Sequence, residues 1–205
     1  MTTANSRTSE YPVDPMFLER WSPRAFSGEN MPEQDLLSMI DAAHWAASAY
    51  NSQPWSFVYA LRDTAAWPKL LGVLVPFNQS WAERASALVV VVSNSLMLPP
   101  GKDKPVPSHS HSFDTGMATA QFVLQGMKLG YHSHGMVGFD LERAFTELNV
   151  PTGHRVEAAF AVGRIGDKSI LPEAVQAREQ PSPRKPVGDV ALAGAFPAGA
   201  AATEI

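Results

Sequence analysis

Two arginines and a serine stand close together near the start of the chain, in a turn that a proline stiffens. Arg20 and Arg24 are four residues apart, with Ser22 and Pro23 between them. Guanidinium forks together with a hydroxyl suit a phosphate or another compact anion. A solvated basic turn is the simpler interpretation when this segment is taken alone. The spacing therefore makes the turn a candidate anion site and leaves both interpretations open.

A run of polar side chains, residues 48–53, follows a predicted helix and leads into a predicted strand. Loops at such junctions often carry ligand-binding residues. The amides of Asn51 and Gln53 each offer donors and an acceptor, so they can bind a heteroaromatic edge on which C=O and N–H groups alternate. Taken alone, the run is better explained as a polar turn whose side chains satisfy its own backbone.

Four of the six histidines form two His-x-His pairs, His109 with His111 and His132 with His134. Residues two apart in a strand point the same way, so either pair, or both pairs meeting in space, could chelate a metal. No carboxylate lies between them as a third ligand, and a pH-sensitive or substrate-lining role is the stronger alternative. Ordinary hydrogen-bonding histidines are favoured, and we predict no metal site.

The composition of the 205-residue chain excludes several classes of function. The net charge is −4, so no general basic field attracts a nucleic acid. The absence of cysteine excludes disulfides, thiolate catalysis, zinc–cysteine sites and iron–sulfur clusters. No apolar run reaches the roughly 18 residues of a membrane span. No secretory signal is visible either. We therefore expect a cytoplasmic protein with no nucleic-acid or membrane partner.

Composition also divides the chain into segments. Residues 1–10 are polar and are predicted to form a mobile N-terminus. Residues 11–190 are predicted to form a single domain, within which the proline-rich residues 98–112 are a surface loop without regular backbone hydrogen bonding. Residues 191–205 are rich in alanine and glycine and are predicted to be a flexible tail.

Helical and strand patterns alternate between these breaks. Helices are predicted at residues 32–47, 65–75, 114–129 and 141–148, and strands at 55–61, 87–92, 131–137 and 156–162. The run 87–92 is typical of a strand buried on both faces. The helix at 114–129 is apolar nearly all round, so it is predicted to be buried on all sides, which in a small domain usually requires a second subunit. The pattern predicts an α+β or α/β fold, a sheet flanked by helices.

The order of short motifs along the chain is more specific than any one of them. The motifs are Arg20-x-Ser22-x-Arg24-x-Phe26, the run from Ala43 to Phe57, Phe77-Asn78, Asp114-Thr115-Gly116, Gly138-Phe139-Asp140, Gly153-His154-Arg155 and Pro183-Arg184-Lys185-Pro186. This ordered set resembles the nitroreductase family of FMN flavoproteins. The resemblance implies an α+β fold with a central, mostly antiparallel sheet, and an intertwined homodimer with an extended C-terminal tail and two FMN sites at its interface.

The resemblance also implies roles for individual residues. The FMN phosphate and ribityl chain would be held by residues of the first turn and of the tail, namely Arg20, Trp21, Ser22, Arg24, Arg184 and Lys185. Asn78 would bind the pyrimidine edge of the flavin, and the backbone at Val137 and Gly138 would lie beside flavin N5. The partner chain would contribute Ser48, Asn51 and Gln53.

The implied activity needs no catalytic side chain, because the flavin carries the chemistry. Hydride would pass from NAD(P)H through flavin N5 to a nitroaromatic, quinone or similar small-molecule acceptor in a ping-pong reaction. The absence of a G-x-G-x-x-G motif fits this family, in which the nicotinamide stacks on the flavin. A flavin-dependent dehydrogenase, oxidase or flavin-consuming enzyme is an alternative on the same fold. A non-catalytic flavin- or metal-binding module is a further alternative.

The sequence departs from the family at two positions. Many members carry a basic residue three positions after the equivalent of Asn78, where this chain has Trp81. The departure predicts either a flavin that is less readily reduced or a more aromatic acceptor pocket. Ala47 stands where proline is common, which removes some rigidity and no polar group.

Overall fold

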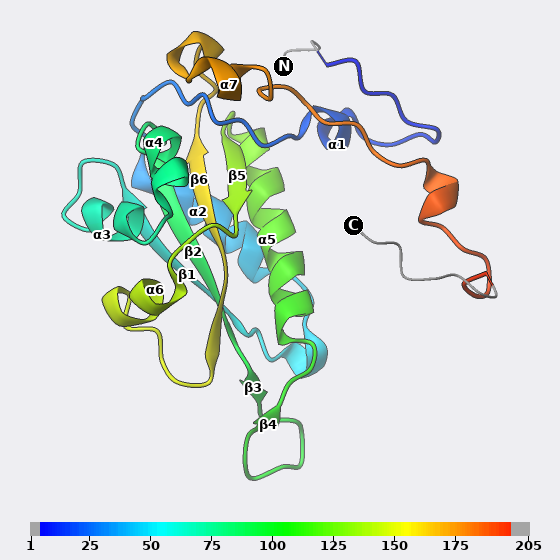
Figure 1. The fold of residues 1–205 in the computed structure, drawn as a ribbon. Coiled ribbons are helices and arrows are strands. Elements are labelled where there is room, and N and C mark those ends of the chain that lie inside the picture. The colour runs from blue at the N-terminus through cyan, green and yellow to red at the C-terminus, as the bar shows by residue number, and fades with distance from the viewer. Residues whose placement is uncertain (1–4, 198–205) are drawn as a thin grey trace.

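The computed structural model describes residues 5–197, and a four-stranded antiparallel sheet lies at its centre (Figure 1). The strands occur in the order β1-β2-β6-β5, with bounds Trp55–Leu61, Ala87–Asn94, His154–Gly163 and His132–Met136. All three pairings are antiparallel. The predicted α+β class, with a mostly antiparallel sheet flanked by helices, is confirmed.

Helices cover both faces of the sheet because β2 sends alternate side chains into two separate cores. Leu88 and Val90 pack with α3 (Trp67–Gly72), α4 (Pro76–Ala82) and α6 (Leu141–Glu147). Val89 and Val91 pack on the opposite face, with α2 (Glu33–His44) and α5 (His111–Lys128). Figure 1 shows the same division, with the sheet between the two groups of helices. The uninterrupted apolar run of β2 is thus explained by burial on both faces.

Helix α5 is less enclosed than its composition predicts. Its inner face, including Ala118 and Phe122, is fully buried against the sheet and α2. Its outer face is open in the single chain, where the side chain of Phe113 is 71% exposed. The prediction of burial on all sides therefore does not hold within one chain, and the second subunit remains a proposal.

The predicted loop 98–112 differs from the structure in its C-terminal half. Val106–Pro107 forms a short strand, β4, that pairs with β3, Leu96–Met97. Ser108 N donates to Ser95 O at 2.8 Å, so a hairpin forms despite the prolines. Helix α5 begins at His111, three residues earlier than predicted. The central residues 98–105 lie outside helices and strands.

Several short elements lie outside the predicted pattern. They are α1 (Pro15–Glu19), α7 (Glu173–Gln176) and the 3₁₀ turns Ala49–Asn51, Lys168–Ile170 and Val187–Asp189. The chain after α7 runs away from the sheet together with the N-terminal segment (Figure 1). These two segments touch, because the backbone N–H of Val187 donates to Glu10 Oε1 at 2.9 Å.

The predicted boundaries of the domain stay predictions. Of the mobile N-terminus, residues 1–4 lie outside the described residues, as do residues 198–205 of the flexible tail. Between residues 5 and 197, no helix combines the length and the apolar character needed to cross a membrane.

Candidate functional site

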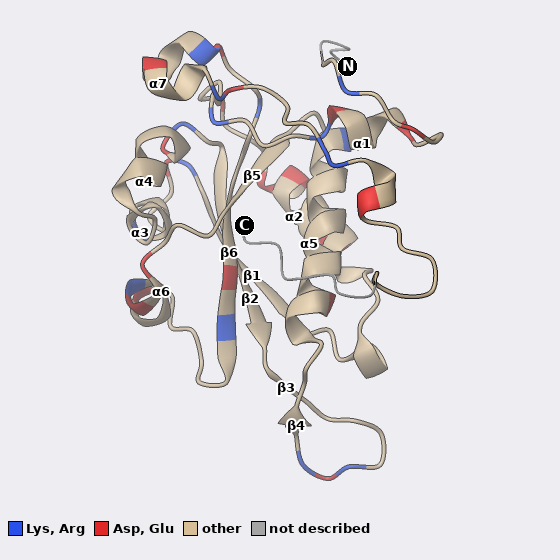
Figure 2. Ribbon diagram, turned by 45° about the vertical axis from the view of Figure 1, so that its right-hand side comes forward, with Lys and Arg blue, Asp and Glu red and all other residues tan. Residues whose placement is uncertain are grey.

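Five arginines line one cavity of about 370 Å³ at the end of the sheet where β5 begins. They are Arg7, Arg20, Arg24, Arg178 and Arg184, and the same cavity is lined by Trp21, Ser22, His134, Gln180 and Ser182. None of these lining residues is a carboxylate. In Figure 2 the basic segments of this region gather around β5, α1 and α7. The walls therefore combine concentrated positive charge with hydroxyl and amide groups.

The cavity unites residues that are far apart in the sequence. The turn after α1 supplies Arg20, Trp21, Ser22 and Arg24, and the segment after α7 supplies Arg184. Glu179 joins the two segments, because its Oε1 accepts from the backbone N–H groups of Arg24 at 2.7 Å and Ala25 at 2.8 Å. Lys185 borders a neighbouring groove and does not line this cavity.

Within residues 5–197, no arginine of the cavity forms an ion pair with a carboxylate. Burial lowers the pKa of Arg20, and the positive charge of Arg184 lowers it further. Burial and then the charge of Arg178 lower the pKa of Arg24, against a smaller opposing effect of Glu179. The Nε atom of Arg24 is buried with no hydrogen-bond partner among the described residues. A bound phosphate dianion would supply negative charge among these guanidinium groups.

The rings of His134 and Trp81 pack against the turn formed by residues 20–24, which we call the arginine turn. His134 Nδ1 donates to Pro23 O at 3.0 Å, and its ring lies 4.6 Å from that of Trp81. The guanidinium of Arg24 lies 5.9 Å from the same indole. Trp81 is only 2% exposed, so it contributes packing under the cavity and almost no surface to a ligand. The prediction that Trp81 makes an acceptor pocket more aromatic is therefore wrong.

Protonation of His134 should destabilise the fold as the pH falls. Burial and the charge of Arg24 lower the pKa of His134 to about 4, against an opposing hydrogen bond to Pro23. An unfolded histidine has a pKa of about 6.5, so between pH 6.5 and pH 4 the unfolded chain binds the proton first. The contribution to stability is complete above pH 6.5 and is lost as the pH falls toward 4. We expect a loss of about 2 kcal/mol in the free energy of unfolding between pH 7 and pH 5.

Urea unfolding at both pH values would measure this loss in the wild type and in His134→Asn, which keeps a donor near Pro23 and does not titrate. The loss should be smaller in the variant by most of that amount. The exposed His109 supplies a matched control, His109→Asn, which should behave as the wild type. An equal loss in all three proteins would contradict the assignment to His134.

Asn78 and Gly138 form an amide edge close to the cavity. Asn78 Nδ2 donates to Gly138 O at 2.9 Å, which leaves the Oδ1 atom to accept from a ligand. A Cβ at position 138 would lie 2.8 Å from that Nδ2, so only glycine allows this close approach. Asn78 precedes Trp81 by one turn of α4. Helix α4 therefore carries Asn78 of the amide edge and also Trp81, which packs against His134 of the cavity wall.

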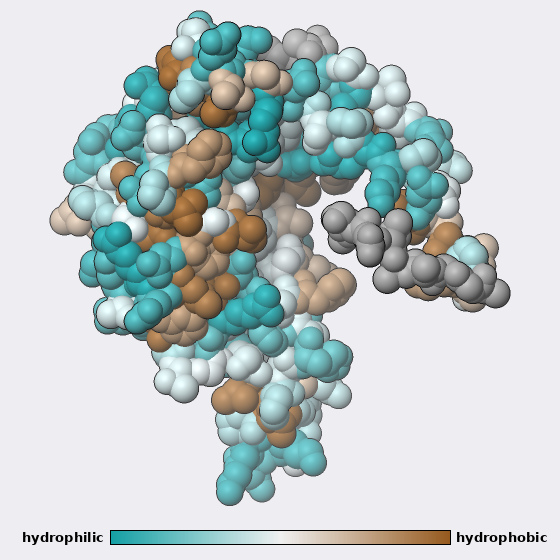
Figure 3. Space-filling view, in the orientation of Figure 1, coloured by the Kyte–Doolittle hydropathy of each residue, from teal (hydrophilic) through white to brown (hydrophobic). Residues whose placement is uncertain are grey.

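Apolar side chains are exposed beside this amide edge. Figure 3 shows a hydrophobic surface between α4 and α6, where Phe77 is 51% and Val137 83% exposed. Together, the apolar surface, the amide edge and the anion cavity are suited to bind a planar heteroaromatic group that carries a phosphate.

The loop 48–53 lies elsewhere in the single chain. Ala49 N donates to Asp114 Oδ2 at 3.1 Å, in the first turn of α5, whereas β5 and the cavity follow the last turn. At 1.5 Å per residue, Asp114 lies about 20 Å along the helix from Lys128, the last residue of α5. One chain therefore does not bring Ser48, Asn51 and Gln53 to the arginine cavity.

The backbone of this loop is strained. Tyr50, Asn51 and Gln53 all have left-handed φ values, 53°, 53° and 46°. Such conformations are uncommon outside glycine and concentrate at functional sites. The loop is held by its own contacts, since Ser48 Oγ accepts from Gln53 N at 3.0 Å. The side chain of Ser48 thus satisfies the backbone of its own turn, as the simpler interpretation predicts. The left-handed backbone of Tyr50, Asn51 and Gln53 supports a function for the loop.

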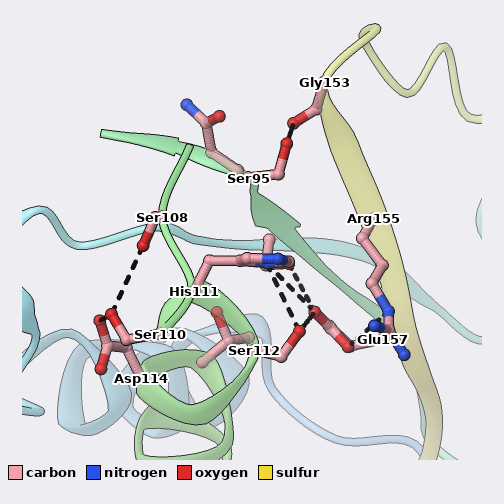
Figure 4. A network of polar contacts seen from close by, with 12 residues as sticks. Ser95, Ser108, Ser110, His111, Ser112, Asp114, Gly153, Arg155 and Glu157 are labelled. Carbon is pink, nitrogen blue, oxygen red and sulfur yellow. Dashed lines mark hydrogen bonds and ion pairs between the residues drawn. The ribbon is translucent and has the colours of Figure 1, made fainter. Parts of the chain in front are cut away.

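One member of the first histidine pair, His111, belongs to a polar network at the start of α5 (Figure 4). Ser93 Oγ donates to Glu157 Oε1 at 2.5 Å and lies 2.8 Å from His111 Nδ1, from which it must accept. Glu157 also accepts from Ser112 and pairs with Arg155. Ser93 has no exposed surface, so it cannot meet a substrate. The network fixes α5 against β2 and β6.

The two histidine pairs do not meet. His111 lies at the start of α5, and His132 and His134 follow its end. Over residues 5–197, no three metal-ligating side chains are grouped in a way that could hold a metal ion.

The comparisons with known proteins agree with this geometry. The sequence profile of the nitroreductase family matches residues 18–74, which hold the arginine turn and the loop 48–53. A solved structure described as an oxidoreductase containing FMN is 49% identical, with a TM-score of 0.91 over 96% of this chain and 99% of that chain. The chain belongs to the nitroreductase family.

Two further relatives of this nitroreductase-family protein are more distant. A protein from Exiguobacterium sibiricum 255-15, solved in complex with FMN, is 20% identical, with a TM-score of 0.70 over 90% of this chain and 99% of that chain, and shows the shared fold. An uncharacterised 15.4 kDa protein of Mycolicibacterium smegmatis is 33% identical over 125 residues, 60% of this chain and 80% of its own length.

Sequence reasoning missed Gln180 and Ser182 of the cavity, and it also missed three lining residues with an arginine or histidine side chain. Arg7 falls in the segment predicted to be mobile, and Arg178 lies outside every motif. For His134 the sequence allows a metal-chelating pair, a pH-sensitive or substrate-lining role, or an ordinary hydrogen-bonding histidine, and it does not point to the arginine cavity. None of the three has a sequence spacing that points to the turn at Arg20, so only the folded chain reveals them.

Proposed function

We propose that this nitroreductase-family protein is an FMN-dependent oxidoreductase that uses NAD(P)H to reduce a nitroaromatic, quinone or similar acceptor by a ping-pong mechanism. The observation that carries the proposal is the arginine cavity, whose His134 packs against Trp81 on α4, the helix that also carries Asn78 of the amide edge. Membership of a family of flavin oxidoreductases supports it as well.

The residues of the site fit the parts of FMN. Arg20 and Arg184 would hold the phosphate, since planar guanidinium forks bind its oxygens in pairs. The hydroxyl of Ser22 would bind the ribityl chain, and Asn78 Oδ1 would accept from the pyrimidine edge. The backbone at Val137 and Gly138 would lie against the ring near N5, where glycine leaves room.

When bound, FMN accepts a hydride at N5 and returns the electrons to the second substrate. The chain's own contribution is to orient the ring and to set the local charge. Arg24 would place a fixed positive charge beside the pyrimidine side of the ring, where negative charge accumulates on reduction. Its support by Trp81 keeps this charge in position.

The proposal includes a homodimer in which each site takes residues from both chains. Two observations support it: Phe113 leaves apolar surface open on the outer face of α5, and the strained loop 48–53 lies about 20 Å along α5 from its own cavity. Ser48, Asn51 and Gln53 would then contact the flavin held by the partner chain.

An absorption spectrum of the purified protein, before and after addition of each nicotinamide without air, tests the proposal. We expect a yellow protein that is bleached by NADH or NADPH and regains its colour with a quinone. A yellow protein that neither nicotinamide bleaches would favour the dehydrogenase or oxidase alternative. A colourless protein that takes up no added FMN would overturn the proposal.

A further inference from the structure

Arg7 joins three segments of the chain at the wall of the arginine cavity. Its Nε donates to Ser182 O at 2.8 Å, and its Nη1 donates to Leu18 O at 3.1 Å and to Arg20 O at 2.6 Å. One guanidinium thereby connects the N-terminal segment, the turn after α1 and the segment after α7. These are the same segments that carry Arg20 and Arg184.

The three hydrogen bonds of Arg7 involve only two of its three guanidinium nitrogens. A guanidinium has five N–H donors, and the three contacts above occupy the single Nε donor and both Nη1 donors. Across residues 5–197, no hydrogen bond engages the two donors of Nη2. Arg7 lines the cavity, and burial, followed by the charges of Arg184 and Arg20, lowers its pKa. The side chain thus lies in positive surroundings with one edge of its fork unpaired.

We propose that Arg7 is a ligand of the cofactor phosphate as well as the clasp that holds the walls of its cavity. Nη2 donates to a phosphomonoester oxygen, while Nε and Nη1 keep their three carbonyl partners. The planar fork makes this double role possible, whereas a lysine presents a single point charge. This inference rests on the proposed function, which identifies the phosphomonoester as FMN.

Binding of FMN and of riboflavin to the apoprotein tests whether Arg7 acts on the phosphate. Riboflavin has the same ring and ribityl chain and no phosphate. We expect Arg7→Gln to weaken FMN binding by about ten- to a hundredfold and to leave riboflavin binding within about twofold. Arg84→Gln is the matched control, because Arg84 is exposed and does not line the cavity. It should leave both affinities unchanged.

The other outcomes overturn the inference. An equal loss of affinity for FMN and riboflavin would show that Arg7 does not act on the phosphate, and unchanged FMN affinity would show that it does not contribute to binding. If the wild type binds neither flavin, the proposed function fails by itself, and titration with inorganic phosphate then decides on Arg7. Weaker phosphate binding by Arg7→Gln than by the wild type would support the inference, and equal binding would overturn it.

Discussion

Replacing both Arg20 and Arg184 with alanine is expected to weaken FMN binding by about 10²- to 10⁴-fold. The two residues line the same cavity from opposite ends of the chain. Each charge-assisted hydrogen bond to the phosphate contributes about 1.5–3 kcal/mol, and about 1.4 kcal/mol corresponds to a tenfold change in affinity. Quenching of flavin fluorescence on titration of FMN with the apoprotein would measure the change.

A second double variant separates local contacts from net charge. Lys69 and Lys168 are exposed and lie outside the cavity, so Lys69→Ala with Lys168→Ala removes the same charge elsewhere. That variant should bind FMN within about threefold of the wild type, because exposed charges beyond a Debye length are screened. Similar affinities for the two double variants and the wild type would mean that the anion site is placed on the wrong residues.

Trp81→Ala is expected to lower the free energy of unfolding by about 3–5 kcal/mol, the usual effect of deleting a buried large aromatic side chain. Trp81 is 2% exposed, and its ring lies 6.4 Å from Phe26 and 4.6 Å from His134. The deletion leaves a cavity under Arg24, so the arginine turn also loses its support. Urea unfolding followed by far-UV circular dichroism would measure the loss.

Trp45 supplies a matched control for this variant. Its side chain is 78% exposed, so Trp45→Ala removes the same atoms from the surface and should change stability by no more than about 0.5 kcal/mol. Comparable losses in both variants would contradict the role assigned to Trp81 as the floor of the cavity.

Much of the fold follows from hydrophobic patterns in the sequence. The strand 55–61 is predicted with the bounds that β1 has, and the run 87–92 predicts a strand buried on both faces, as β2 is. These patterns are informative because a strand or helix must bury its apolar face. Helix α4 and the β3–β4 hairpin are too short for a detectable period. They form because the surrounding packing and the hairpin hydrogen bonds hold them.

The candidate site was predictable only where its residues are close in sequence. Arg20, Ser22 and Arg24 were identified by spacing, and they lie in one cavity. Arg184 was placed there by family resemblance, and the structure agrees, whereas Lys185 borders a different groove. Arg7 and His134 reach the cavity through tertiary contacts with Ser182 and Pro23. No local pattern encodes such contacts.

The contacts between Glu179 and the backbone of Arg24 and Ala25 make one wall of the cavity depend on a segment outside the sheet. The last strand of the sheet, β6, ends at Gly163, so residues 178–184 follow every strand in the chain. The strands can therefore pair without the segment that completes the cavity. A phosphate-bearing cofactor meets its full set of arginines only when that segment is docked, so its binding adds free energy to the closure of that wall.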